Sequence, residues 1–424
     1  MSEPAVQVDT PPLTAAARTT AMLAAFLGWM CAGMEMSLMV PVTRPAIQDF
    51  LGRSNPTNLE TVADQWLSWF VAAFLLGAAL GGLLFGWLGD RLGRSKAMGL
   101  SVLCYSLVTG ASYFVTSPEQ LLVLRFVACL GIGGMWPCGV ALVMEASPNR
   151  SRAFLAGWIG TAANVGFLVL GIVMLYYPIT RDSWRWVMVL GGCPAILGVA
   201  ILLFVAESPK WLSREVQAAP PTPLGETFRP LYLRRTLLGI VLGTVPLLGG
   251  WASGQRLIPW AGQVGEAAGL ENLKATVQIS WALGAVLGSL LGGWFASWLG
   301  NRQSYFWISV LSLGLSLYIF LLLDPTQPLF LAATFGIGLI STLYFGWLPY
   351  FLPTLFPVRV RAAGTGVAYN FGRIFSAVAL LSSTALSTLF AGNIAKMGAT
   401  TSLVYAAGIF LVWMIPQQSE LSDE

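Results

Sequence analysis

The chain has 424 residues, of which 56% are hydrophobic and 10% are charged, and its formal net charge is +4. Soluble globular proteins carry about 25% charged residues, so this composition excludes that class and indicates a protein whose solvent includes the lipid bilayer. The net charge is too small to indicate nucleic-acid binding, and the absence of histidine excludes His-based catalytic triads, metal sites and proton relays.

The five cysteines lie inside apolar runs and show neither the spacing of a metal site nor that of a disulfide framework. We interpret them as small buried hydrophobic residues. No P-loop motif is present, so ATP is not expected to be the direct energy source. The sequence therefore predicts no cofactor, no metal site and no enzymatic activity.

In chain order, residues 1–18 are polar and rich in Pro, Ala and Thr, which predicts a disordered cytoplasmic tail. About twelve apolar runs of spanning length follow. A backbone in lipid must satisfy its own hydrogen bonds, so we expect these runs to be helices; the alternating segments of a β-barrel are absent. The runs lie near residues 20–42, 65–88, 97–116, 119–144, 153–177, 186–206, 235–253, 275–298, 304–323, 328–352, 361–390 and 398–415.

Two polar segments are longer than the other connections. Residues 43–64 are predicted to face the outside, and residues 207–234, rich in Pro, Glu and Arg, are predicted to form a cytoplasmic linker. With both termini in the cytoplasm, Lys and Arg favour the inner loops by about two to one. We therefore expect a multi-pass protein of the cell (inner) membrane, with the tail at 417–424 also inside.

The linker divides the predicted helices into six and six, in residues 19–206 and 235–416. Two motifs recur between these parts: Leu80–Trp87 matches Leu287–Trp294, and Pro148–Ala153 matches Pro357–Ala362, at offsets of 207 (287 − 80) and 209 (357 − 148) residues. Halves of even helix number have parallel topology and pack about an axis along the membrane normal, with a site between them at mid-depth.

The segment Gly86–Lys96, with Asp90, Arg91 and Arg94, resembles the signature loop of the major facilitator superfamily. Glu207-Ser208-Pro209-Lys210-Trp211-Leu212 is similar to the sequence that closes the first half of its sugar and organic-ion porters. Phe356–Gly366, with the following Asn370-x-Gly372-Arg373, resembles the aromatic-acid:proton symporters. The resemblance covers nearly the whole chain and implies an all-α membrane fold of twelve helices in two pseudo-symmetric six-helix halves.

The resemblance also implies a gate at the cytoplasmic rim. Asp90 is expected to latch the two halves together, whereas the second copy of the loop has Ser297 in its place. The alternative is a basic turn that only sets topology, with solvated loop charges around it. The expected gate residues are Asp90, Arg91, Arg94, Glu145, Arg152, Glu207 and Arg361.

Glu35 lies inside the first apolar run. An ionisable group within a membrane segment is costly and indicates a functional site, and burial favours the protonated form of a carboxyl group. Glu35 is therefore our candidate proton carrier, with substrate contact or a structural pairing with an arginine as alternatives. The aromatic-acid symporters commonly have a second acid where this chain has Ala32.

Arg125 and Arg373 are also intramembrane, although Arg125 is close enough to the end of its run to snorkel. A buried guanidinium needs an anionic partner, either Glu35 or a substrate carboxylate. Two arginines against one acid leave a positive surplus that favours an anionic substrate. Asn370, Asn164, Gln278, Trp136 and Tyr344 complete the expected substrate cavity, with interhelical contacts or an interfacial aromatic belt as the alternatives.

We therefore expect a monomeric secondary transporter that imports a small organic anion, such as an aromatic acid, a sialate or a related metabolite, together with a proton. Three alternatives remain: an uncoupled facilitator, a drug or metabolite efflux antiporter, and a non-transporting sensor of the same fold. The run at 153–176 contains no proline, which disfavours the efflux antiporter.

Overall fold

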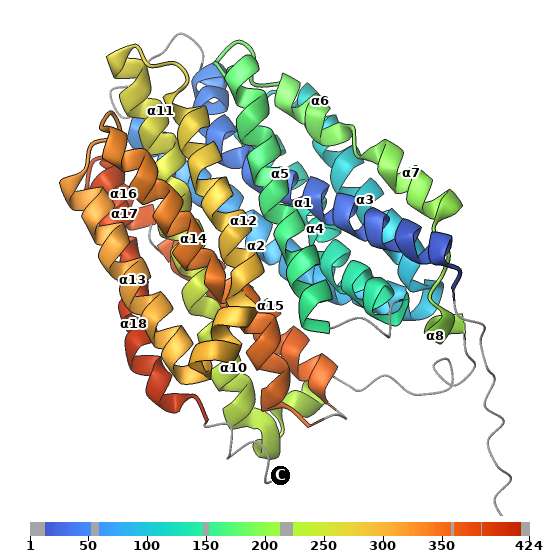
Figure 1. The fold of residues 1–424 in the computed structure, drawn as a ribbon. Helices are drawn as coiled ribbons and strands as arrows, with labels where there is room; N and C mark the ends of the chain where they lie inside the picture. The colour runs from blue at the N-terminus through green and yellow to red at the C-terminus, as the bar shows by residue number, and fades with distance from the viewer. Residues whose placement is uncertain are drawn as a thin grey trace, which may run out of the picture.

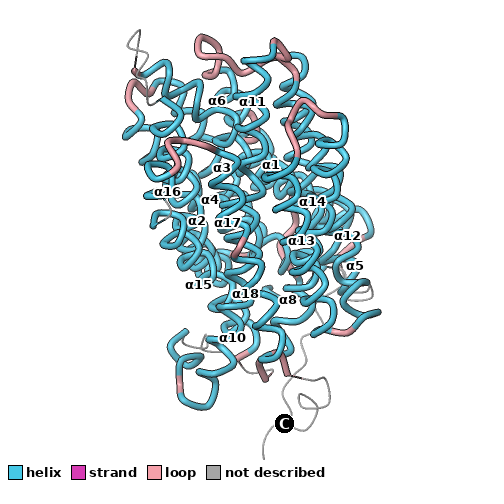
Figure 2. Tube along the Cα trace, turned by 90° about the vertical axis from the view of Figure 1, so that its left-hand side faces the viewer, coloured by secondary structure: helices cyan, strands magenta, loops and turns pink. Residues whose placement is uncertain are grey.

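The computed structural model describes residues 13–51, 59–146, 152–212, 224–357, 360–382 and 384–416. Within these ranges the chain forms helices and no strand (Figures 1 and 2). The predicted all-α class is therefore confirmed. The predicted tail at 417–424 and residues 1–12 of the other tail lie outside the described residues, whereas residues 15–18, which we expected in that tail, already belong to the first helix.

The first half contains six membrane spans, the last of which is broken at Pro194 into two helices. Its helices are α1 (Ala15–Phe50), α2 (Leu59–Leu92), α3 (Arg94–Ala111), α4 (Pro118–Ala146), α5 (Arg152–Tyr176), α6 (Trp186–Gly192) and α7 (Ala195–Phe204). The short helix α8 (Pro209–Leu212) and the 3-10 turn η2 (Leu224–Phe228) follow in the predicted linker.

The second half begins with α10 (Pro230–Leu248), which starts five residues before the predicted boundary. One turn of π-helix, η3 (Gly249–Ser253), and the 3-10 turn η4 (Gly254–Arg256) connect α10 to α11 (Leu257–Ala268). The remaining helices are α12 (Leu273–Leu299), α13 (Asn301–Leu322), α14 (Pro328–Phe351), α15 (Arg361–Ser382), α16 (Thr384–Leu389), α17 (Ile394–Ser402) and α18 (Val404–Leu411).

Eleven segments of the described chain are long and apolar enough to cross a membrane. The segment around α15 is not one of them, because Asn370 and Arg373 lower its mean hydropathy. With its 22 residues, α15 is nevertheless long enough to span and packs against both α2 and α10. With α15, the spans of the described chain number twelve.

The predicted outer loop at 43–64 is wrong in extent. α1 continues to Phe50 through Pro41 and Pro45, and α2 begins at Leu59. The polar side chains in these extensions have protein partners: Arg44, for example, forms an ion pair with Glu60. Partners of this kind let the helices continue where the polar sequence predicted a solvated loop.

The sequence repeat corresponds to one helix contact made twice. In α2, a Cβ added to Gly81 would lie 1.9 Å from the carbonyl oxygen of Leu130 in α4. In α12, a Cβ added to Gly288 would lie 2.1 Å from the carbonyl oxygen of Leu339 in α14. Only glycine permits such close backbone approach, so the two halves use the same packing at equivalent positions.

We predict that Gly81→Ala lowers the melting temperature of the purified protein in detergent, because the methyl group overpacks α2 against α4 at a cost of about 1–3 kcal/mol. Gly86→Ala is the matched control in the same helix, since a Cβ there has no atom within 4 Å. Equal melting temperatures for the two variants would contradict the close contact.

Candidate functional site

Glu35 and Arg125 lie together in the interior of the first half. The Glu35 side chain, on α1, is fully buried and accepts a hydrogen bond of 2.9 Å at Oε2 from the Thr109 hydroxyl on α3. Arg125 on α4 places Nη1 3.9 Å from the same oxygen. The guanidinium also donates to the carbonyl oxygens of Glu35, at 2.9 Å, and of Met36, at 3.3 Å. These contacts hold the Arg125 side chain in the interior of the bundle, where it is 3% exposed.

The second carboxylate oxygen of Glu35 is free. Oε1 is buried and has no hydrogen-bond partner among the described residues. Gly191 of α6 leaves room for it, because a Cβ at that position would lie 2.5 Å from Oε1. A protonated carboxyl group differs from a carboxylate by one O–H donor, and Oε1 is the oxygen on which a proton would displace no existing bond.

Arg373 is the second buried arginine and comes from α15 in the other half. Its Nη1 donates to the carbonyl oxygen of Ala78 at 3.2 Å and to Oδ1 of Asn370 at 3.3 Å, and its guanidinium lies 4.8 Å from the ring centre of Tyr369. It has no carboxylate partner in the described part of the chain. Among the described residues, its positive charge is thus stabilised by dipoles and a ring.

The two arginines approach the same stretch of α2. The guanidinium of Arg125 lies 5.9 Å from the ring centre of Phe74, and Arg373 bonds to the backbone of Ala78, four residues later. Four residues of helix rise about 6 Å. The two arginines, one from each half, therefore contact neighbouring turns of α2 in the bundle interior, as expected of a site between the halves.

Asn164 and Gln278 connect the two halves. Asn164 on α5 donates to the Ala285 carbonyl oxygen at 3.3 Å and to Ser289 Oγ at 3.1 Å, both on α12. Gln278 on α12 donates through Nε2 to the carbonyl oxygen of Phe167 at 3.0 Å. Both are buried, so both act at least as interhelical contacts.

The two predicted aromatic cavity residues lie in separate halves. Trp136 on α4 packs 5.0 Å from Trp29 on α1, measured between ring centres. Tyr344 on α14 is fully buried, with its hydroxyl 2.5 Å from that of Ser309 and its ring 4.9 Å from that of Tyr305. These contacts place Tyr344 in the apolar core of the second half.

Four of the expected gate residues lie together in the first half, namely Asp90, Arg94, Glu145 and Glu207. Asp90 pairs with Arg94 at 2.6 Å, and Arg94 lies 4.0 Å from Glu145. Glu207 accepts a bond of 3.0 Å from the backbone of Ser95.

The remaining described contacts of the gate region also stay within the first half. The Ser208 hydroxyl bonds to Glu145, which fastens the α8 segment to α4, and the gate residue Arg91 stacks on Trp87. Arg152 and Arg361 begin α5 and α15, and their side chains lie outside the described residues. The latch between the halves stays a prediction.

Asp64 and Arg256 form a buried ion pair that the sequence analysis missed. Nε of Arg256 lies 3.2 Å from one carboxylate oxygen of Asp64 and Nη2 lies 3.4 Å from the other, and both side chains are less than 5% exposed. The pair joins α2 to η4 and so bridges the halves. The apolar residues Leu257–Ala261 were the available signal that Arg256 lies within a helical span rather than a loop.

A second set of polar contacts bridges the halves near α11, at the top of Figure 1. Arg44 of α1 pairs with Glu60 at 2.8 Å and with Glu266 of α11 at 2.6 Å. Lys274 of α12 donates to the carbonyl oxygens of Pro41 and Ile179. The structure thus joins the halves at the α11 end, while the described gate cluster at the α8 end joins only elements of the first half.

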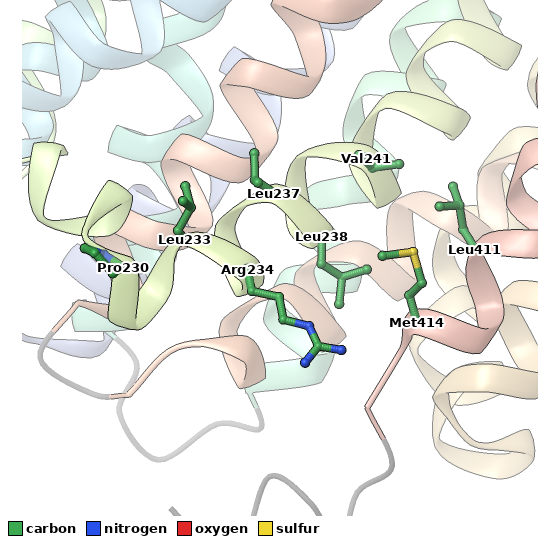
Figure 3. Close-up of a pocket in the computed structure, with 8 residues that line it drawn as sticks. All are labelled: Pro230, Leu233, Arg234, Leu237, Leu238, Val241, Leu411 and Met414. Carbon is green, nitrogen blue, oxygen red and sulfur yellow. The ribbon is translucent and has the colours of Figure 1, made fainter.

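A groove on the surface lies elsewhere (Figure 3). It has a volume of about 420 Å³ and contains none of the predicted cavity or gate residues. Apolar side chains of α10 and α18 form most of its wall, and Arg234 is its one charged lining residue. The lining residues are Pro230, Leu233, Arg234, Leu237, Leu238, Val241, Leu411 and Met414.

Comparison with known proteins supports the architecture. The chain matches the model of the Major Facilitator Superfamily over residues 22–380. It is 28% identical over 370 residues to the inner membrane metabolite transport protein YgcS of Escherichia coli, covering 80% of this chain and 79% of that protein. It is 25% identical over 406 residues to the cis,cis-muconate transport protein of Acinetobacter baylyi, covering 93% and 92%.

A solved structure shares the fold. The partially occluded inward open conformation of the xylose transporter XylE from E. coli superposes with a TM-score of 0.73 at 15% identity, covering 96% of this chain and 99% of that one. At this identity the likeness concerns the fold alone. It agrees with the arrangement of two six-helix halves described above.

The buried pair leads to a stability prediction. Asp64→Ala leaves Arg256 charged and buried, so we expect it to lower the free energy of unfolding by about 3–5 kcal/mol, measured as a fall in melting temperature in detergent.

Two further variants test the assignment to a buried pair. The double variant Asp64→Ala/Arg256→Met removes both charges and should recover at least half of the loss. Asp90→Asn, which breaks an exposed pair, should cost about 0–1 kcal/mol. A loss for Asp64→Ala no larger than that for Asp90→Asn would contradict the assignment.

Proposed function

Since this chain belongs to the major facilitator superfamily, we propose that it imports a small organic anion together with a proton by alternating access. Members of the family are transporters, so the protein is a transporter and not an enzyme. The observation that carries the proposal is the buried contact of Glu35 with Arg125. The carboxyl group of Glu35 can gain or lose a proton, whereas the guanidinium of Arg125 stays positively charged, and the two groups lie side by side in the interior of the bundle.

The arginines support an anionic substrate. Arg125 is balanced by Glu35, whereas Arg373 has only dipolar partners and a ring in the described chain. A buried guanidinium without a carboxylate is costly, and a bound carboxylate would offset that cost through charge-assisted hydrogen bonds. The muconate transport protein to which this chain is similar carries such a compound.

Glu35 supports proton coupling. In the ionised state, its carboxylate holds the guanidinium of Arg125. Protonation removes this attraction and leaves Arg125 with two backbone carbonyl partners, so that its positive charge acts together with that of Arg373 on the substrate carboxylate. Loading of the proton and loading of the anion then favour one another, which is the thermodynamic requirement of a symporter.

The inter-half contacts support alternating access. We place the α8 end of the bundle and both termini in the cytoplasm, following the distribution of Lys and Arg. The Asp64–Arg256 and Arg44–Glu266 contacts then close the outer side and must break for a substrate to enter. When these outer contacts are broken, the Asp90 cluster is the group that would close the inner side. Each monomer contains a complete pathway between residues 19–206 and 235–416, connected by the linker at 207–234.

The coupling role of Glu35 is tested by uptake of muconate and of aromatic and sugar acids into proteoliposomes, with and without an inward proton gradient. With one proton per monovalent anion, the transport step carries no net charge and one pH unit supports about tenfold accumulation. We expect Glu35→Gln to lose accumulation and to keep exchange of the anion, because a neutral side chain cannot carry the proton. Glu119→Gln, at the exposed start of α4, is the control. Unchanged gradient dependence in Glu35→Gln would contradict the coupling role of Glu35, whereas uptake by the wild type that does not depend on the gradient would favour an uncoupled facilitator.

The role of Arg373 is tested by equilibrium binding to the purified protein. Arg373→Gln removes the charge opposite the substrate carboxylate, so we expect the dissociation constant to rise by at least about tenfold. Lys396→Gln also removes one positive charge, but from an exposed side chain, and should leave the constant unchanged. Equal effects of the two substitutions would exclude a direct contact with Arg373.

A further inference from the structure

The groove between α10 and α18 has a charged end and an apolar end. Arg234 is the one charged residue among those that line it. Figure 3 shows the Arg234 guanidinium projecting away from α10 at one end of the groove, with Val241 and Leu411 at the other end. Leu238 is only 8% exposed, whereas Leu237 is 49% exposed and Val241 is 41% exposed. We refer to this surface as the α10–α18 groove.

The α10–α18 groove runs along the membrane-spanning direction of α10. This helix begins at Pro230, directly after the linker, and Arg234 lies in its second turn. Val241 is seven residues further on, which is about 10 Å along a helix axis. One leaflet of the hydrocarbon core is about 15 Å thick, half of the whole core. The groove therefore extends through most of one leaflet, and the long Arg234 side chain can reach the level of the lipid headgroups.

The charge of Arg234 is not balanced within the described chain. The side chain is exposed, and no ion pair or hydrogen bond joins it to another described residue. The neighbouring Arg235, by contrast, is partly buried and donates to the carbonyl oxygen of Leu355 at 3.4 Å. Arg229, the residue before α10, is also exposed, and the N-terminus of a helix adds a partial positive charge. This end of the groove is therefore positive.

An anionic phospholipid matches both ends of the groove. Basic pockets between membrane helices on the cytoplasmic side favour anionic headgroups, and we placed the linker before α10 in the cytoplasm. A zwitterionic headgroup would bring an ammonium group for which the lining residues offer no carboxylate. A free phosphate ion would leave the leucines uncovered. The volume of about 420 Å³ is within the range of sites that hold small molecules, about 300–1,000 Å³.

We propose that the α10–α18 groove binds one anionic phospholipid, with its phosphate on Arg234 and an acyl chain along Leu237, Leu238 and Val241. Arginine and phosphate form charge-assisted hydrogen bonds, and the leucine side chains hold the acyl chain in place. None of the predicted cavity or gate residues lines the groove. The inference is therefore independent of the proposed substrate and of the proposed coupling ion.

The experiment measures lipid binding to the delipidated full-length protein in detergent by native mass spectrometry. The probes are dioleoylphosphatidylglycerol, which is anionic, and dioleoylphosphatidylethanolamine, which has the same chains and is zwitterionic. The wild type should bind the first phosphatidylglycerol molecule about fivefold more tightly than phosphatidylethanolamine. Arg234→Gln should abolish this preference. Lys396→Gln removes the same charge from an exposed side chain of α17 and should retain it.

A second variant tests the apolar part of the groove. Leu237→Trp fills the space assigned to the acyl chain, so it should weaken the binding of phosphatidylglycerol. Leu321→Trp, at an exposed position of α13 outside the groove, should not. This pair decides the matter if Arg234→Gln does not elute as a single species. Equal affinities of the wild type for the two lipids, or the same loss in Arg234→Gln and Lys396→Gln, would overturn the proposal.

The alternative occupant is the chain's own segment 417–424, which follows the groove residue Met414 closely and contains three acidic residues. A protein truncated after residue 416 separates this segment from a lipid. If a lipid occupies the groove, the truncation leaves the affinity for phosphatidylglycerol unchanged. A rise of about fivefold on truncation would assign the groove to segment 417–424 and overturn the proposal.

Discussion

The proposed coupling depends on one contact, between a fully buried carboxylate and a buried guanidinium in the first half. Glu35 and Arg125 are 3.9 Å apart, and the arginine also holds the α1 backbone. In a low-dielectric interior, each charge is stabilised by the other, by the Thr109 hydroxyl on the side of Glu35 and by the backbone carbonyl oxygens on the side of Arg125. A proton on Glu35 therefore changes the balance of the whole site, which is how a small chemical event can influence the packing of entire helices.

The position of this pair links it to the rest of the bundle. Arg125 reaches Phe74 on α2 and Arg373 reaches Ala78 on the same helix, while Trp251 of the second half packs on Phe74. α2 also carries Asp64, which pairs with Arg256 of the other half. α2 thus contacts the two buried arginines, Trp251 of the second half and Arg256. A movement of α2 relative to α15 and η4 therefore affects all of these contacts together.

The helical membrane fold and the family were predictable from sequence because they depend on run length, composition and the order of local motifs. The repeat was predictable because Gly81 and Gly288 serve the same close packing. The Asp64–Arg256 pair was not, since its members lie near predicted span ends and a helix boundary depends on tertiary partners. Polar sequence and two prolines indicated a loop after residue 42, yet Arg44 finds carboxylates in α2 and α11. Which buried arginine meets Glu35 likewise follows from helix packing that no local pattern encodes.

The most direct test of the central claim is the movement of protons during transport. Proteoliposomes containing a trapped pH-sensitive dye are given an organic anion that the wild type accumulates, with no pre-existing pH gradient. Proton symport through Glu35 predicts acidification of the interior as the anion enters, and loss of this signal in Glu35→Gln while the anion still exchanges. Entry of the anion without acidification, or acidification that persists in Glu35→Gln, would contradict it.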